Sequence, residues 1–341
     1  MEVGVYLKKP YVLFVGDVED DLAAKVAHGI ADWRPNECVG QIKLPGCKAI
    51  IDLPILTIES AIEKGAKTLV LGVANRGGGI SQSWHETLVK AAIFGLDIAS
   101  GLHQLLSTVP NLNTTAEKNN VVLHEARIPV GPFSIAHAKP RSGRRLLTVG
   151  TDCSVGKMYA ALAIEKTMLS RDISVDFRAT GQTGILISGN GVPIDAVVAD
   201  FMSGAIEELC PANDSNHWDI IEGQGSLFHP SFAGVSLGLL HGAQPTDLIL
   251  CHEPTRTHMR GLPEVSLPTI KHCMETNLNA ARLVNPEVRF AGIALNTVAL
   301  DDHETSKIIK EFSQEFDLIT CDPLKHGVDD LIEFLLQGQV C

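Results

Sequence analysis

The sequence predicts an α/β protein of two domains, each built on a parallel β-sheet, with helices on both faces of the second sheet. Short continuous apolar runs alternate with helical stretches, a pattern typical of buried parallel strands joined by helices. The length of 341 residues suits about two domains of ordinary size. The segment PVGPFSIAHAKPRSGRR, rich in proline, glycine and basic residues, interrupts the alternation and reads as an interdomain linker.

The first domain is expected over residues 1–128, followed by a linker over 129–144. Its predicted strands lie at residues 11–16, 68–73 and 121–127, and its predicted helices at 20–31, 58–64 and 83–94. The linker shows no apolar periodicity, as is usual for a segment between domains.

The second domain is expected over residues 145–341, where the alternation is clearer. Its predicted strands lie at 145–149, 175–179, 218–222, 247–251, 288–296 and 318–321. A helix is expected at 158–170, and another contains Phe312 and Phe316 at a spacing of four. Asp301, with Glu304 three residues later, predicts a capping box at the start of that second helix.

The composition excludes several classes of function. Asp plus Glu number 40 against 28 Lys plus Arg, a net charge of −12, which disfavours binding to nucleic acid or an anionic membrane. No apolar run approaches the roughly 20 residues of a membrane helix. The eight cysteines include no CxxC pair, which indicates reduced thiols rather than a disulfide frame. We therefore expect a cytoplasmic protein that acts on small molecules, and we further expect a homo-oligomer.

The most informative segment is LLTVGTDCSVGKMYAALAI, in which a predicted strand, a glycine-containing loop and a predicted helix follow one another. Backbone N–H groups of such a loop bind phosphate, and a lysine adds a positive charge. The predicted phosphate loop comprises Gly150, Thr151, Asp152, Cys153, Ser154, Val155, Gly156 and Lys157. A strand–turn–helix joint with a chance Gly–Lys pair is the structural alternative, and Cys153 is either a reactive thiol or a small loop residue.

The loop departs from the usual G-x-x-x-x-G-K-[ST] pattern at both ends. Gly150 stands one place early, and Met158 replaces the hydroxyl residue that normally binds magnesium. A thioether is a soft ligand, whereas magnesium prefers hard oxygen ligands. The sequence therefore predicts a phosphate-bearing ligand whose phosphates need not be hydrolysed, and no tightly bound metal.

Other polar residues follow the predicted strands, where ligands bind in an open parallel sheet. These residues are Arg178, Gln182, Glu222, His252, Glu253, Arg256, His258, Arg260 and Asn296. The spacing of His252, Glu253 and His258 fits no metal motif, and Asn296 is placed where a nucleotide base could be recognised. In the first domain, Arg76 precedes three consecutive glycines after a predicted strand. That segment is either a ligand contact or a flexible turn.

Taken together, these motifs resemble the D-glutamate N-acetyltransferase-like family, long described only as a domain of unknown function. The resemblance is carried by NRGGG (75–79), SGLHQLL (100–106), GTDCSVGK (150–157), RATGQTGI (178–185), DFMSGAIEEL (200–209) and EGQGSL (222–227). It implies a Rossmann-like N-terminal domain, a P-loop NTPase-like C-terminal domain, and acetyl transfer from acetyl-CoA to the nitrogen of an amino acid.

The second half also resembles dethiobiotin synthetase and related P-loop ligases. Their loop reads G-T-D-x-x-V-G-K-T, which residues 150–157 match, and their E-G-x-G turn matches Glu222, Gly223 and Gly225. Met158 departs at the magnesium position. That departure disfavours ATP-driven chemistry and favours a loop that binds the phosphates of coenzyme A.

The leading hypothesis is an N-acetyltransferase for a small acidic amino acid such as D-glutamate, with acetyl-CoA as co-substrate. The expected substrate-binding residues are Arg76, Arg178, Gln182 and Arg256. The base that takes the amine proton is expected among Glu222, Asp152 and His258, in that order. We expect the site to lie between the domains. The alternatives are a Mg-ATP-dependent ligase or kinase, and a non-catalytic nucleotide-responsive binding protein.

Overall fold

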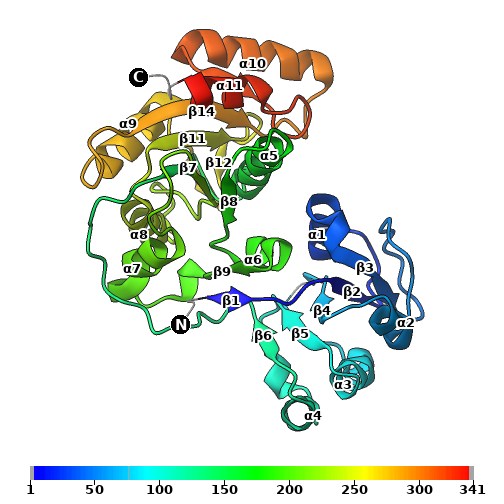
Figure 1. The fold of residues 1–341 in the computed structure, drawn as a ribbon. Coiled ribbons are helices and arrows are strands. Elements are labelled where there is room, and N and C mark those ends of the chain that lie inside the picture. Colours follow the sequence, from blue (N-terminus) through cyan, green and yellow to red (C-terminus); the bar gives the residue numbers. More distant parts are fainter. Residues whose placement is uncertain (1–3, 76, 338–341) are drawn as a thin grey trace. The chain divides into compact units, whose positions relative to one another are not determined.

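A computed structural model describes residues 4–75 and 77–337 (Figure 1). The chain forms two compact units. The first comprises the residues up to Gly131 together with Gly181–Ala196, and the second comprises Pro132–Thr180 together with the residues from Val197 onward. Each unit contains a parallel sheet with helices packed on it, which confirms the predicted α/β architecture.

The sheet of the first unit has the strand order β3-β2-β4-β5-β6, and all its neighbouring strands are parallel. The strands are β2 (Tyr11–Gly16), β3 (Cys38–Lys43), β4 (Thr68–Leu71), β5 (Asp97–Ser100) and β6 (Leu123–Glu125). The helices are α1 (Lys25–Trp33), α2 (Ile58–Glu63), α3 (His85–Ile93) and α4 (Leu112–Asn119). Every residue of β2 is buried, as its continuous apolar run predicts.

A short segment from the later half of the sequence completes the first unit. It contains α6 (Gln182–Ser188) and β9 (Asn190–Gly191). β9 pairs antiparallel with β1 (Val5–Tyr6), and α6 packs on α1. The sequence placed this segment in the second domain. The structure groups it with the first unit, where Ile185 and Ile187 are fully buried.

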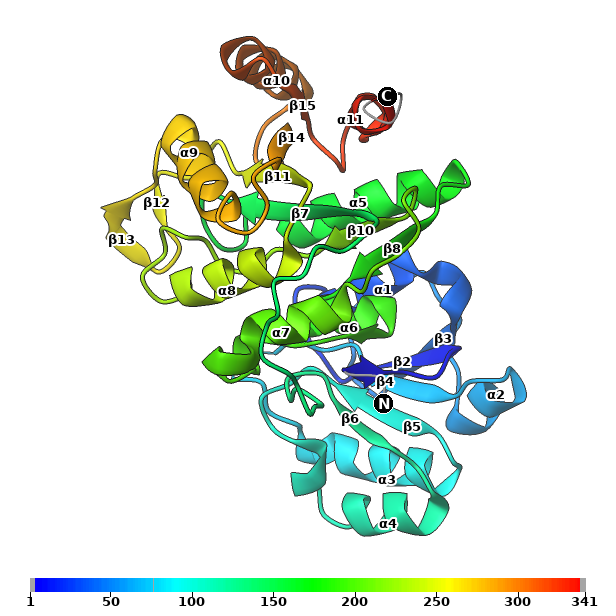
Figure 2. The same ribbon diagram turned by 60° about the vertical axis from the view of Figure 1, so that its left-hand side comes forward.

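The sheet of the second unit has the order β15-β14-β11-β7-β10-β8, again all parallel. The strands are β7 (Arg144–Gly150), β8 (Val175–Arg178), β10 (Trp218–Ile221), β11 (Asp247–His252), β14 (Arg289–Leu295) and β15 (Ile319–Cys321). The helices α5 (Lys157–Ser170) and α11 (Asp329–Gln337) cover one face, and α8 (Ala233–Ala243) and α9 (Ile270–Ala281) cover the other (Figure 2).

Two further helices and a two-stranded hairpin complete the second unit. The helix α7 (Ala199–Leu209) packs on α8, and α10 (Asp302–Phe316) lies beside β15. The strands β12 (His258–Met259) and β13 (Leu262–Ser266) form an antiparallel hairpin after β11. Asp301 accepts from the Glu304 N–H and Glu304 accepts from the Asp301 N–H, which confirms the predicted capping box of α10.

The middle of the predicted linker lies along α7 and is bonded to it. Glu207 accepts hydrogen bonds from the backbone N–H groups of His137 and Ala138, each at 2.8 Å. A Cβ atom at Gly204 would lie 1.9 Å from the Ser134 carbonyl oxygen, so only glycine allows this close approach. These contacts join the segment from Pro132 onward to the second unit.

No helix among residues 4–75 and 77–337 combines the length and the apolarity that crossing a membrane requires.

Candidate active site at the phosphate loop

The predicted phosphate loop lies at the carboxyl end of β7, a central strand of the second sheet, and leads directly into α5. Gly156 caps α5 with φ 101°, and Ser154 has φ 56°, so both residues are in the left-handed region. A Cβ atom at Gly150 would lie 2.8 Å from the Val155 side chain. This strand–loop–helix geometry directs the N–H groups at the start of α5 toward the carboxyl edge of the sheet.

Lys157 is held inside the loop. Its side chain is buried and its Nζ donates to the Asp152 carbonyl oxygen at 2.8 Å. Burial lowers the pKa of the Lys157 ammonium. A Cβ atom at Gly223 would lie 1.7 Å from the Thr148 carbonyl oxygen and 3.0 Å from Lys157 Cδ. Gly223 therefore lets the turn after β10 pack directly against β7 and the Lys157 stem.

Asp152 is a buried carboxylate that accepts three hydrogen bonds. Its Oδ2 accepts from Arg256 Nη1 at 2.9 Å and from the Arg260 N–H at 2.7 Å, and its Oδ1 accepts from the Cys153 N–H at 2.7 Å. Burial raises the pKa of Asp152, but these hydrogen bonds outweigh burial and leave the pKa below its ordinary value. A carboxylate with three such donors is a weak proton acceptor.

Two of the three arginines predicted to bind substrate, Arg178 and Arg256, have acidic partners inside the second unit. Arg256 bonds Asp152, Glu253 and the Cys153 carbonyl oxygen. The carboxylates that hold Arg178 belong to Asp219, 2.6 Å from Nε, and Asp176, 2.9 Å from Nη2. These contacts fix both guanidinium groups. Their roles toward substrate stay predictions.

Glu222 lies directly after β10, which neighbours β7 in the sheet. Its Oε2 accepts from the Thr180 N–H at 2.9 Å, and the Thr180 hydroxyl donates to its carbonyl oxygen at 2.6 Å. Glu222 is 4% exposed. The first-ranked base candidate is therefore fixed at the same edge of the sheet as the phosphate loop.

His252 lies in the site, but the sequence did not predict a role for it there. The sequence analysis considered His252 only as a metal ligand and rejected that motif. It ends β11, the other neighbour of β7, and its Nδ1 lies 3.0 Å from Thr151 Oγ1. Burial and the nearby Arg256 charge lower the pKa of His252 from 6.5 to about 4, so the imidazole is neutral near pH 7. Its carbonyl oxygen accepts from the Asn296 N–H at 2.8 Å. The one sequence signal for His252 is its place at a strand end.

The structure describes two of the three remaining predicted site residues. His258 is exposed in β12, and its ring contacts Thr257. Gln182 begins α6 in the first unit, where its side chain lies beside Gly101. Arg76 lies outside the described residues. Whether any of them binds substrate or takes a proton stays a prediction.

Among residues 4–75 and 77–337, two groups of side chains could supply three metal ligands each. One consists of Asp152, Cys153 and His229, and the other of Asp176, His217 and Asp219, with ligand atoms within 4.8 Å of one another in each group. An arginine already occupies the carboxylates of both groups. Burial, together with the Asp152 charge, raises the pKa of the Cys153 thiol. A neutral thiol supports the small-loop-residue interpretation over a reactive thiolate.

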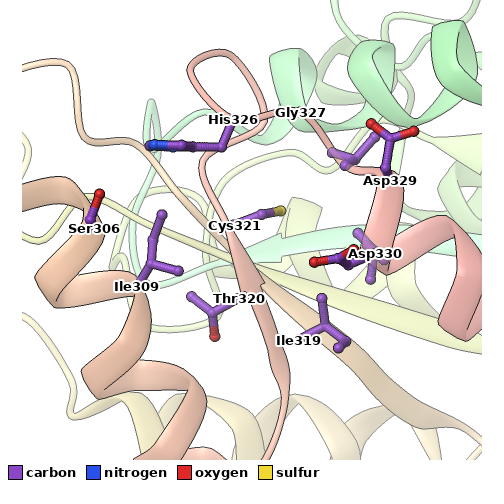
Figure 3. A pocket seen from close by; sticks show the side chains of 11 residues that line it. Ser306, Ile309, Ile319, Thr320, Cys321, His326, Gly327, Asp329 and Asp330 are labelled. Atoms are coloured by element: carbon purple, nitrogen blue, oxygen red, sulfur yellow. The ribbon is translucent and has the colours of Figure 1, made fainter. Parts of the chain in front are cut away.

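A separate cavity of about 300 Å³ lies beside β15, between α10 and the start of α11 (Figure 3). Its lining combines the apolar Ile309 and Ile319 with the polar His326 and Asp330. None of the residues predicted for the active site lines it. The cavity is thus distinct from the phosphate loop, although both belong to the second unit.

The parallel sheets and the strand–loop–helix element define an α/β protein with a Rossmann-like first domain and a P-loop second domain. Family models carry the same descriptions: a DUF1611 Rossmann-like domain matches residues 43–129, and a DUF1611 P-loop domain of unknown function matches residues 134–332. The chain belongs to the DUF1611 family. A crystal structure of a DUF1611 family protein from Anabaena variabilis is 29% identical, covers 97% of this chain and 100% of its own, and superposes with a TM-score of 0.80.

Two relatives extend almost along the whole chain. A protein of Tritonibacter scottomollicae is 54% identical over 96% of this chain and 99% of its own length. A protein of Pseudoalteromonas is 49% identical over 96% of this chain and 98% of its own length. Both are named D-glutamate N-acetyltransferase. The resemblance seen in the sequence motifs and the prediction of an enzyme are confirmed, and the names support an N-acetyltransferase function.

Proposed function

We propose that this enzyme transfers the acetyl group of acetyl-CoA to the amino group of D-glutamate or a closely similar acidic amino acid. The observation that carries the proposal is the identity of 54% over 96% of the chain to a protein named D-glutamate N-acetyltransferase. The chemistry of the phosphate loop supports it independently. The loop offers N–H groups and Lys157, while Met158 stands in place of the magnesium-binding hydroxyl residue.

In this proposal the phosphate loop binds the diphosphate of coenzyme A, and Asn296 recognises its base. Asn296 lies next to the loop, since a Cβ atom at Gly156 would be 3.6 Å from Asn296 Cβ. Backbone N–H groups at the start of a helix suit phosphate oxygens without a metal ion. Magnesium is then dispensable, because no phosphate bond is broken.

The reaction itself needs a neutral amine. The neutral amine nitrogen attacks the thioester carbonyl carbon, the C–S bond breaks, and the nitrogen then loses a second proton, which the departing coenzyme A thiolate takes up to become the thiol. The proton lost by the substrate ammonium has to reach a base. Among the described candidates Glu222 is favoured, because the Asp152 carboxylate already accepts from three donors.

Calorimetric titration with acetyl-CoA and with Mg-ATP in parallel tests which ligand the loop takes. The proposal expects saturable binding of acetyl-CoA that persists in a metal chelator, and much weaker binding of Mg-ATP. Tight binding of Mg-ATP with no binding of acetyl-CoA would favour the ligase or kinase alternative instead.

A further inference from the structure

The arginines at the phosphate loop differ in how their side chains are used. The Arg256 guanidinium donates hydrogen bonds to Asp152, to Glu253 and to two loop carbonyl oxygens. Arg260, four residues later, lies in the turn between β12 and β13. We propose that Arg260 is a substrate-binding residue that pairs with a carboxylate of the acidic amino acid. This inference rests on the proposed acetyl transfer.

The main chain of Arg260 is fixed against the phosphate loop. Its N–H donates to Asp152 Oδ2 at 2.7 Å. Its carbonyl oxygen lies 3.2 Å from His229 Nε2, which donates because the Ser231 N–H occupies His229 Nδ1. His229 and Asp152 are both buried. The Cα of Arg260 is therefore held at the loop by two buried groups.

The side chain of Arg260, by contrast, is exposed. Within residues 4–75 and 77–337, its guanidinium forms neither a hydrogen bond nor an ion pair. The guanidinium lies near enough to Cys153 for its charge to pull the pKa of that thiol downward, against the larger effect of burial. A fixed backbone thus presents, beside the phosphate loop, a cation that has no partner among the described residues.

The roles of the neighbouring cations leave this one for the amino acid. Lys157 and the loop N–H groups suit the diphosphate of the acyl donor. Arg256 already pairs with Asp152 and Glu253. A guanidinium presents two parallel N–H donors that match a carboxylate. An acidic amino acid brings two carboxylates, and no residue that the structure describes uses the side-chain donors of Arg260, so they can meet one of them.

The test compares the steady-state kinetics of wild type, Arg260→Gln and Arg260→Lys with acetyl-CoA and D-glutamate as substrates. We expect Arg260→Gln to raise the KM for D-glutamate by about 10- to 100-fold, the loss of one charge-assisted pair, while the KM for acetyl-CoA changes less than about twofold. Arg260→Lys keeps the positive charge but loses the paired N–H donors of the guanidinium. Its KM for D-glutamate should therefore lie between those of wild type and Arg260→Gln. Arg282→Gln, at an exposed arginine after α9, is the matched control and should behave like wild type.

The kinetic results distinguish a failure of the Arg260 role from a failure of the proposed acetyl transfer. A rise in the KM for acetyl-CoA alone would place Arg260 on the donor phosphates and overturn the inference. Unchanged KM values for both substrates would also overturn it. If wild type transfers no acetyl group to D-glutamate, the proposed function fails first and this inference fails with it. Equal thermal midpoints of all four proteins would show that a change in KM does not come from misfolding.

Discussion

Arg256 Nη1 lies 2.9 Å from Asp152 Oδ2, so an ion pair with a fully buried carboxylate ties the segment after β11 to the phosphate loop. The same guanidinium donates to the Cys153 carbonyl oxygen at 2.7 Å. Arg256 and Asp152 are 104 residues apart in the sequence. The shape of the loop thus depends on a contact from a neighbouring strand end as well as on its own glycines.

Asp152→Asn should destabilise the second unit. The substitution leaves the half-buried Arg256 guanidinium without one of its carboxylate partners, at a fully buried position, and breaking such a buried ion pair costs about 3 kcal/mol. Urea denaturation at pH 7 measures the change in the free energy of unfolding. Glu275→Gln, at an exposed position on α9, is the control. A loss no larger than that of the control would contradict a structural role for the pair.

The contribution of Asp152 should also depend on pH. Its folded-state pKa is below the ordinary value, so the carboxylate stabilises the fold fully above the unfolded pKa of about 4. The contribution is lost as the pH falls through the folded-state pKa. The stability difference between wild type and Asp152→Asn should therefore be constant from about pH 5 to 7 and shrink below about pH 4. A stability difference between wild type and Asp152→Asn that grows as the pH falls would contradict a lowered folded-state pKa of Asp152.

Lys157→Ala should weaken binding of the phosphate-bearing ligand. The lost charge-assisted contact is worth about 1.5–3 kcal/mol, which corresponds to about 10- to 100-fold in the Kd for acetyl-CoA. Calorimetry measures the Kd, and Lys271→Ala on the exposed side of α9 controls for net charge. Unchanged affinity for every phosphate ligand tested would rule out a phosphate-binding role for the loop.

Met158→Thr restores the hydroxyl that the loop lacks. We expect the variant to gain affinity for Mg-ATP, because a hydroxyl oxygen is a magnesium ligand and a thioether is not. Its affinity for acetyl-CoA should change little. Nucleotide titrations with magnesium and with a chelator separate the metal-dependent part. Wild-type protein that already binds Mg-ATP tightly and hydrolyses it would remove the main physical support for the acyltransferase.

His252 should also make the stability of the fold depend on pH. As with Asp152, its contribution to stability is lost as the pH falls. Its folded-state pKa is about 4 against 6.5 for the free side chain, so between these values the unfolded state binds more protons. Stability should therefore fall on acidification across this window, by about 3 kcal/mol in total. His252→Asn should flatten the dependence, whereas His303→Gln, at an exposed position on α10, should not. Equal pH slopes for wild type and His252→Asn would contradict the burial argument.

The strands and the phosphate loop could be predicted because their signals are local. The run YVLFVG became β2 over the same residues, and the strand before the loop was placed within one residue at each end of β7. β3 and β5 escaped prediction. β3 contains Gly40 and is only partly buried, and β5 has just four residues with an aspartate at its start.

The features that escaped prediction depend on tertiary contacts. α6 groups with the first unit because it packs on α1 and because β9 pairs with β1, and no local pattern marks pairing across so many residues. The sequence predicted that Arg178 and Arg256 bind substrate, but it did not indicate that Asp219 and Asp152 pair with them. Arginine partners become visible only when strand ends are brought together.

The most direct test of the central claim is the transfer assay with purified protein, acetyl-CoA and D-glutamate, in a metal chelator and without ATP. We expect free coenzyme A thiol and N-acetyl-D-glutamate to appear in equal amounts, and we expect Lys157→Ala to reduce the formation of both. No N-acetylated product from acetyl-CoA, with hydrolysis of Mg-ATP by the same preparation, would contradict it.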